Sequence, residues 1–386
     1  MAWSNIIGQS RIISSLRHAA ADGRVAHGYC FWGTAGAGKD AVALELAKMM
    51  NCLVPRRDKD GLLEACDECK SCHQADKFEH PNIRFIFSLP AGKSAPADRD
   101  ESPLFRLSDD QIKIIREQME LKASDHYHDI DIPNAAQIKI ASIRDIKKNV
   151  TMSAVQSGMR VVIISEADQM TDEAANAFLK TLEEPHSNIT LILTTSRREQ
   201  LPQTILSRCQ QLYFPVLPDD EIAAALVARR GVALEDARLM AAFGQGSYSR
   251  ACDFLNEDMR RSRHDIIDAL RAALKRSEYR SALLHHVETL SGEKDRTRME
   301  IMLALLLLWL RDAYEMSVAG AAAVITNVDQ RQSIERFAAA FPDAPFGDMA
   351  IAVEEAAEAV RRNVDRRLIL LTVLLRCRYM LPQGNR

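Results

Sequence analysis

A nearly complete phosphate-binding loop constrains the fold of this chain more than any other segment. Residues 33–40 read GTAGAGKD and follow the pattern G-x-x-x-x-G-K-[ST] until the last position. The apolar run at residues 29–32 predicts a strand before the loop, and residues 41–50 predict a helix after it. A glycine-rich turn between a strand and a helix is the setting in which such a loop binds phosphates. The sequence therefore predicts an α/β domain with a nucleotide-type site.

Two positions that bind Mg²⁺ in working sites of this kind are altered. Asp40 replaces the Ser or Thr whose hydroxyl holds the ion. Ser165, at the end of a buried strand predicted over residues 161–165, replaces the Asp that makes the second contact, while Glu166 keeps the place of a water-orienting Glu. Because both ligands are missing, we expect no intrinsic ATPase activity and no productive ATP binding. The alternative is an active ATPase in which Asp40 itself binds Mg²⁺, because carboxylates are good ligands for that ion.

The order of predicted elements divides the chain into three domains. Over residues 1–215 short apolar strands alternate with helical segments, which indicates a parallel sheet with helices. The strands are predicted at residues 29–32, 83–87, 161–165, 189–194 and 211–214. Only helical patterns follow, as a small helical domain over 216–258 and an all-α domain over 262–386. Residues 88–136 interrupt the α/β pattern, and we expect an insertion with mobile flanks and one helix from Ser108, where Gln111 completes a capping box.

Four cysteines after the helix of the loop form a metal-ligand pattern. Cys52, Cys66, Cys69 and Cys72 have the spacing C-x13-C-x2-C-x2-C, and four thiolates suit a tetrahedral Zn²⁺. The segment around them is rich in charges and could hardly fold without such a link. Disulfides are the alternative, and a reducing compartment disfavours them. We therefore expect a lobe over residues 52–72 with one structural zinc.

Composition limits the location and the partners of the chain. Of its 386 residues, 47% are hydrophobic and 27% are charged, as in soluble globular proteins. The longest strongly apolar stretch, residues 301–310, is too short to cross a bilayer, and no export signal is visible at the N-terminus. We therefore expect a cytoplasmic protein with no membrane partner. A formal net charge of −3 argues against an autonomous DNA-binding regulator, because phosphate binding needs clustered Lys and Arg.

Over almost its whole length the sequence resembles bacterial clamp-loader subunits of the AAA+ class. The resemblance rests on residues 6–9, His27, the loop at 33–40, the four cysteines, residues 165–168, residues 174–185 and the Ser-Arg-Cys triplet at 207–209. Within DNA polymerase III, the altered Mg²⁺ positions resemble the delta-prime type more than the gamma/tau type, whose loop normally ends in Lys-Thr. An active gamma/tau-like ATPase is the alternative.

This resemblance implies a RecA-like AAA+ domain that carries the zinc lobe, a helical lid, and a helical collar domain that assembles a pentameric loader. It implies a stator subunit of DNA polymerase III, the DNA-directed DNA polymerase holoenzyme, that does not hydrolyse ATP. The implied partners are the gamma/tau and delta subunits, the sliding clamp (beta), and primed DNA contacted through the complex.

The resemblance also assigns roles to individual residues. A degenerate nucleotide site would comprise Gly33, Gly36, Gly38, Lys39, Asp40, Ser165, Glu166 and Arg250. Arg208 would act as an arginine finger that reaches, across a subunit interface, the phosphates held by a neighbour. On the sequence alone, an arginine in a surface salt bridge is the alternative for Arg208. The resemblance assigns no role to the insertion over residues 88–136, which it leaves unexplained.

Overall fold

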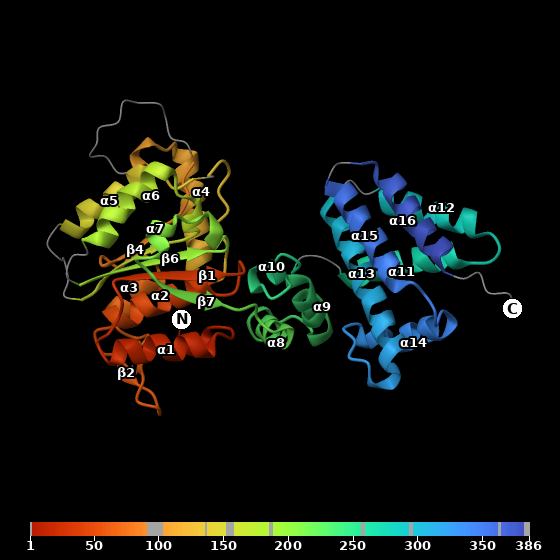
Figure 1. Cartoon of the computed structure of the whole chain (residues 1–386), viewed down its shortest axis with the longest axis horizontal. Coiled ribbons are helices and arrows are strands. Elements are labelled where there is room, and N and C mark those ends of the chain that lie inside the picture. The colour runs from red at the N-terminus through yellow and green to blue at the C-terminus, as the bar shows by residue number, and fades with distance from the viewer. Residues whose placement is uncertain are drawn as a thin grey trace. The chain divides into compact units, whose positions relative to one another are not determined.

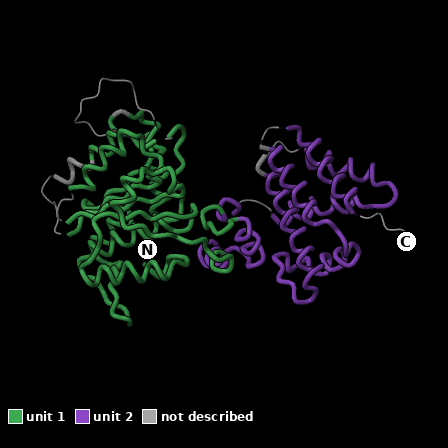
Figure 2. The backbone as a smooth tube through the Cα atoms, viewed as in Figure 1, with its two compact units in different colours: residues 1–222, 244–250 green, residues 223–243, 251–386 purple. Residues whose placement is uncertain are grey.

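The computed structural model describes residues 2–90, 103–135, 137–151, 158–184, 188–255, 259–292, 296–361 and 364–381. The backbone forms two compact units, one of residues 1–222 with 244–250 and one of residues 223–243 with 251–386 (Figure 2). The segment predicted as a lid is divided between these units, and the three-domain division stays a prediction. Residues 91–102 of the insertion and Pro185, which ends one motif, lie outside the described residues.

The first unit is built on a five-stranded parallel sheet with the order β4-β5-β6-β1-β7 (Figure 1). Its strands are β1 (Gly28–Gly33), β4 (Ile83–Ile86), β5 (Arg160–Ile164), β6 (Ile189–Thr195) and β7 (Gln210–Phe214). All seven residues of β6 are buried, as expected for a parallel strand covered on both faces. The five predicted strands are confirmed, each to within one residue at either end.

Helices cover both faces of this sheet (Figure 1). On one face α1 (Ser10–Ala21) and α2 (Lys39–Asn51) pack against Tyr29 and Phe31 of β1. On the other face α5 (Ile140–Thr151), α6 (Asp172–Glu183) and α7 (Gln203–Leu206) pack around Cys30. Alternate residues of β1 therefore enter opposite cores, which is the two-residue period of a strand. The loop between β1 and α2 lies at the carboxyl end of the sheet, where such folds bind ligands.

The insertion contains a folded element. Helix α4 (Asp109–Ser124) begins with the predicted capping box, in which the Ser108 hydroxyl accepts from the Gln111 N–H and the Gln111 side chain accepts from the Ser108 N–H. Leu107, Ile115 and Ile132 form a small core of their own, against which Phe87 of the sheet unit packs. The described part of the insertion is therefore fixed to the edge of the sheet.

The described chain after β7 contains helices and no strands. They are α8 (Asp219–Arg230), α9 (Leu234–Gly244), α10 (Tyr248–Cys252), α11 (Met259–Leu274), α12 (Tyr279–Ser291), α13 (Arg296–Ala319), α14 (Arg331–Ala340), α15 (Phe346–Arg361) and α16 (Arg366–Met380). Helix α13 is central to the second unit, because it packs against α11, α14 and α15. A parallel α/β domain followed by an all-α region confirms the predicted fold class. Among the described helices, none combines the length and the apolar character required to cross a membrane.

Candidate functional site

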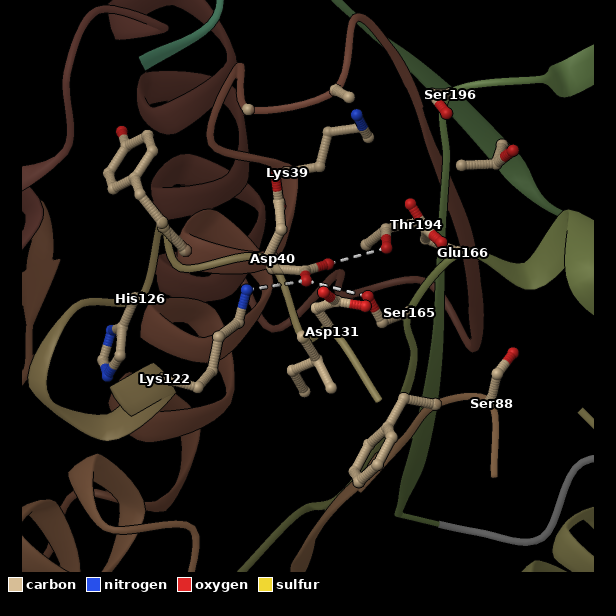
Figure 3. Close-up of a pocket in the computed structure, with 18 of the residues that line it drawn as sticks. Lys39, Asp40, Ser88, Lys122, His126, Asp131, Ser165, Glu166, Thr194 and Ser196 are labelled. Carbon is tan, nitrogen blue, oxygen red and sulfur yellow. Dashed lines mark hydrogen bonds and ion pairs between the residues drawn. The ribbon is translucent and has the colours of Figure 1, made fainter. Parts of the chain in front are cut away.

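A pocket lies at the carboxyl ends of β1, β5 and β6, where the phosphate-binding loop meets the insertion (Figure 3). The loop keeps the backbone shape of the motif, because Gly33, Gly36 and Gly38 all have positive φ angles of 146°, 70° and 93°. Lys39 points back onto its own loop, and its Nζ donates to the Gly33 carbonyl at 2.9 Å and to the Thr34 carbonyl at 2.7 Å. Burial lowers the pKa of Lys39, although Asp40 and other nearby carboxylates oppose this effect. The Lys39 ammonium is therefore bound by carbonyl groups of its own loop.

Asp40 is bound by three donors of the chain itself (Figure 3). Its Oδ1 accepts from the Thr194 hydroxyl at 2.7 Å, and its Oδ2 accepts from the Ser165 hydroxyl at 2.8 Å. The same Oδ2 lies 3.0 Å from the ammonium of Lys122, which comes from α4 of the insertion. The side chain of Lys122 is only 2% exposed and that of Asp40 is 18% exposed. The two residues that depart from the metal-binding pattern, Asp40 and Ser165, therefore bind each other.

The electrostatics of the pocket keep Asp40 ionised. Burial alone would raise its pKa, but the charge of Lys122 and the hydrogen bonds from Thr194, Ser165 and Lys122 outweigh burial and lower the pKa. Glu166 behaves differently, because burial and then the neighbouring carboxylates of Asp168 and Asp40 raise its pKa. A carboxylate with all its donors inside the protein has no need of an external cation.

Four acidic residues and two lysines line this pocket, namely Asp40, Asp129, Asp131, Glu166, Lys39 and Lys122. Nucleotide phosphates would meet an excess of negative charge here unless a cation intervened.

The segment after α9 closes on the loop at Gly36. The Tyr248 N–H donates to the Gly36 carbonyl at 3.2 Å, and a Cβ at Gly36 would lie 2.1 Å from the Ser247 hydroxyl. Two predicted site residues do not line the pocket described here. Gly33 packs against β7, where a Cβ would lie 2.1 Å from the Phe214 carbonyl oxygen. Arg250 instead donates to the Gln245 side chain at 3.0 Å.

Arg208 lies on the surface, between α7 and β7. Its Nη1 donates to the Thr204 carbonyl at 2.9 Å, and its Nη2 lies 2.8 Å from Glu183 Oε1 at the end of α6. It is absent from the residues that line the pocket in the described chain. Within this chain Arg208 is therefore in a surface salt bridge, as one of the two expectations had it, and a role toward a second subunit stays a prediction.

The four predicted zinc ligands come together in the structure. The sulfur atoms of Cys52, Cys66, Cys69 and Cys72 all lie within 4.8 Å of one another, and three of the separations are 4.0, 3.9 and 3.5 Å. A tetrahedral Zn²⁺ with bonds of about 2.3 Å requires sulfur separations of about 3.8 Å, so the cluster fits that ion. A disulfide requires about 2 Å, and the four thiols are free. Backbone N–H groups also donate to three of these sulfur atoms, as second-sphere donors do in such sites.

The cysteine lobe is anchored to the first unit by buried cations. Arg17 of α1 pairs with Asp58 at 2.7 Å and with Glu64 at 3.0 Å. Lys48 of α2, 2% exposed, pairs with Glu45 at 3.0 Å and with Asp76 at 3.3 Å at the end of α3 (Lys70–Asp76). The hairpin of β2 (Arg56–Arg57) and β3 (Leu63–Glu64) completes the lobe. These contacts hold the cluster on the flank of α2, so the lobe suits a structural role.

Lys122, Tyr127 and Thr194 are among the pocket residues that sequence reasoning did not identify. Thr194 could have been found, because it ends a predicted strand of the same sheet. Lys122 carried no signal of its own, since it is one of many charged residues in an amphipathic helix of the insertion.

The chain is similar to known proteins over most of its length. A family model described as DNA polymerase III, delta subunit, matches residues 8–218, and one described as DNA polymerase III, delta subunit, C terminal, matches residues 258–378. The chain is 26% identical over 357 residues to DNA polymerase III subunit delta' of Bacillus subtilis, and the match covers 92% of each protein. It is also 26% identical over 251 residues to the tau/gamma subunit of Haemophilus influenzae, which covers 64% of this chain and 29% of that protein.

Two solved structures from Thermotoga maritima are similar to the chain at low scores. One is a protein related to the DNA polymerase III gamma subunit, which is 14% identical to this chain at a TM-score of 0.35. The match covers 95% of this chain and 99% of that chain. The other is the RuvB Holliday junction branch migration motor, with 13% identity, 86% and 89% covered, and a TM-score of 0.39. Scores this low add nothing to the argument about fold or function.

Proposed function

Since the chain belongs to the DNA polymerase III delta subunit family, we propose that it is a clamp-loader subunit that does not hydrolyse ATP. In this role it is a stator, a subunit of fixed conformation, and works with gamma/tau and delta subunits to load the sliding clamp on primed DNA. The relatives named as delta' and tau/gamma subunits support this proposal.

The observation that carries the proposal is that three donors of its own chain, one of them an ammonium, bind Asp40. Phosphoryl transfer in sites of this kind depends on Mg²⁺ to neutralise the phosphates. A Mg²⁺ ion at Asp40 would be repelled by the ammonium of Lys122, which already neutralises this carboxylate, and Ser165 offers no carboxylate to complete the coordination. On this proposal, the loop glycines, Lys39 and Glu166 belong to a nucleotide-like site that has lost productive ATP binding.

The surface position of Arg208 supports a role toward a neighbouring subunit. Its side chain is 38% exposed and its partner Glu183 is 49% exposed. Exposed pairs of this kind contribute about 1 kcal/mol or less, so the guanidinium can leave Glu183 at small cost. We propose that it then binds phosphates presented by the neighbour and stabilises transition-state charge as an arginine finger in trans.

The first test is the ATPase activity of the isolated chain. We expect no Mg²⁺-dependent turnover above background, and no change in Lys39→Ala. Turnover that disappears in Lys39→Ala would instead favour an active gamma/tau-like ATPase in which Asp40 binds the metal. That result would contradict the stator proposal.

The second test is Arg208→Ala in a loader reconstituted with gamma/tau, delta, clamp and primed DNA. An arginine finger contributes on the order of 10³ in rate at one site, and the loss for the whole loader should be smaller because other interfaces remain. Arg208→Lys should also be impaired, since an ammonium cannot match phosphate oxygens as the planar guanidinium does. Arg56→Ala, which removes another exposed arginine paired with one carboxylate, is the matched control and should have no effect. Unchanged turnover of Arg208→Ala, at equal assembly by size-exclusion chromatography, would remove Arg208 from this role.

A further inference from the structure

The insertion supplies one wall of the nucleotide-type pocket. Lys122 comes from the last turns of α4, and His126, Tyr127 and Asp129 follow in the segment after it. This wall has its own hydrophobic core, and an isolated bridge between Leu89 and Gln137 joins the two ends of the insertion. The described part of the insertion is therefore an ordered part of the pocket wall.

Tyr127 fills the space next to the loop. Its hydroxyl accepts from the Ile7 N–H at 2.8 Å, and its ring meets that of Tyr248 edge-on with centroids 5.1 Å apart. A Cβ at Gly38 would lie 2.8 Å from the same hydroxyl, so the ring lies directly on the loop. The pocket that remains has a volume of about 260 Å³, which is below the range of about 300–1,000 Å³ typical of small-molecule sites.

The ammonium of Lys122 lies where the loop and the strand end meet. It bonds to Asp40, the loop position that would hold Mg²⁺, and Ser165, the second metal position, donates to the same carboxylate oxygen. It also donates to the His128 carbonyl at 2.7 Å and lies 5.9 Å from the centre of the Phe85 ring. A buried ammonium with a carboxylate, a carbonyl and an aromatic face around it is well compensated for the loss of water.

We infer that Lys122 is a built-in replacement for the divalent cation, and that the insertion thereby makes this pocket independent of metal. The ammonium supplies the positive charge that Asp40 requires, and the segment after it covers the loop. This inference rests on the proposed function and gives the loss of ATP hydrolysis a structural cause. It also predicts what the pocket would take without the lysine, namely a small divalent cation bound by oxygen ligands.

The test is a chemical rescue of the full chain with Mn²⁺ or Mg²⁺. Lys122→Met keeps most of the buried stem and removes the charge, which leaves Asp40 without a cation. We expect its melting temperature to be lower than that of the natural chain in metal-free buffer. A metal concentration about a hundredfold above the Kd of the vacated site should raise the melting temperature of Lys122→Met by roughly 5 °C or more. The natural chain should show no such rise.

Two controls identify the site of the effect. Lys113→Met removes an exposed lysine of the same helix, so it should melt like the natural chain and ignore the metal. Asp40→Asn combined with Lys122→Met removes both charges, so this double variant should also ignore the metal. If Lys122→Met does not fold in metal-free buffer, it is refolded with Mn²⁺, and recovery of folded chain is the expected result. No recovery, or a melting temperature of Lys122→Met that does not respond to metal, would overturn the inference.

The outcome is separable from that of the proposed function. The rescue is measured on the isolated chain by melting and by Mn²⁺ binding, whereas the stator role is measured by turnover of the assembled loader. An inactive natural chain whose Lys122→Met variant takes up no metal would refute this inference alone. A natural chain that binds Mg²⁺ and hydrolyses ATP would refute both.

Discussion

Lowering the pH should destabilise the first unit through His126. This histidine lies in the pocket wall formed by the insertion, with its ring edge-on to Phe78 at 6.0 Å and only 4% exposed. Burial lowers its pKa to about 4, with a further contribution from the charges of Lys122 and Lys48 and an opposing one from Asp76. Its Nδ1 has no hydrogen-bond partner among the described residues. The native structure therefore holds the ring in its neutral form.

The sign and size of the effect follow from proton linkage. An unfolded chain binds a proton on His126 near pH 6.5, whereas the folded chain binds it only near pH 4. Neutral His126 therefore makes its full contribution to the free energy of unfolding above pH 6.5, and this contribution is lost as the pH falls toward 4. The difference between the pKa of about 4 in the folded chain and 6.5 in the unfolded chain, at 1.36 kcal/mol per pH unit, changes the free energy of unfolding by about 3 kcal/mol.

The assay is urea unfolding of the natural chain and of His126→Gln at several pH values across this window. We expect the free energy of unfolding of the natural chain to fall more steeply with decreasing pH than that of the variant. Glu45, whose pKa burial raises to about 7, acts with the opposite sign, so the difference between the two slopes is the quantity to compare. His18→Gln, which removes an exposed histidine of the same unit, should keep the natural slope. Equal slopes for His126→Gln and the natural chain would refute the reasoning.

Two further predictions concern other parts of the chain. The protein purified without chelator should contain one zinc per chain by elemental analysis, and a chain without zinc would contradict a zinc-binding role of the four cysteines. Cys69→Ser should lower the zinc content and increase proteolysis between Ala47 and Phe78, because the lobe loses a metal ligand. In the second unit, Arg263→Met should lower the free energy of unfolding by about 2 kcal/mol, because Arg263 is 3% exposed and its loss removes charged hydrogen bonds to Asp329, which is 34% exposed. Arg261→Met, which alters an exposed arginine two residues earlier, is the control for urea unfolding of the same unit.

The fold was largely predictable because its signals are local. Each strand of the sheet lies in a short, largely apolar run bounded by polar or turn residues. Where helices follow, the spacing of the apolar residues changes to the helical period of 3.6 residues. The helix of the insertion was predictable for the same reason, since Ser108 and Gln111 form their capping box within one turn. The anchoring of the cysteine lobe was not predictable, because Arg17 and Lys48 reach partners that are distant in sequence and that no spacing rule connects.

The altered residues of the site were found from the sequence, but their consequence was only half predicted. The loss of Mg²⁺ ligands at positions 40 and 165 was read from the sequence, and the structure adds that four acidic residues line the pocket. The sequence did not indicate that a lysine would neutralise Asp40, since Lys122 lies 82 residues away in an insertion to which the resemblance assigned no role. A buried charge requires a partner, but burial itself is known only once the tertiary structure brings α4 onto the loop.

The two departures from the metal-binding pattern, Asp40 and Ser165, are chemically coupled to Lys122. With Asp40 on the loop and one ammonium bonded to it, an Asp at position 165 would place a second carboxylate beside the first and leave one negative charge without a bonded cation. Ser165 avoids this, because its hydroxyl donates to Asp40 where a carboxylate would repel it. Lys122 without Asp40 would in turn be a buried cation with a carbonyl and an aromatic ring beside it but without the carboxylate that balances its charge. Each of the three residues is therefore favourable only when the other two are present, and Asp40→Thr alone should destabilise the chain more than Asp40→Thr combined with Lys122→Met.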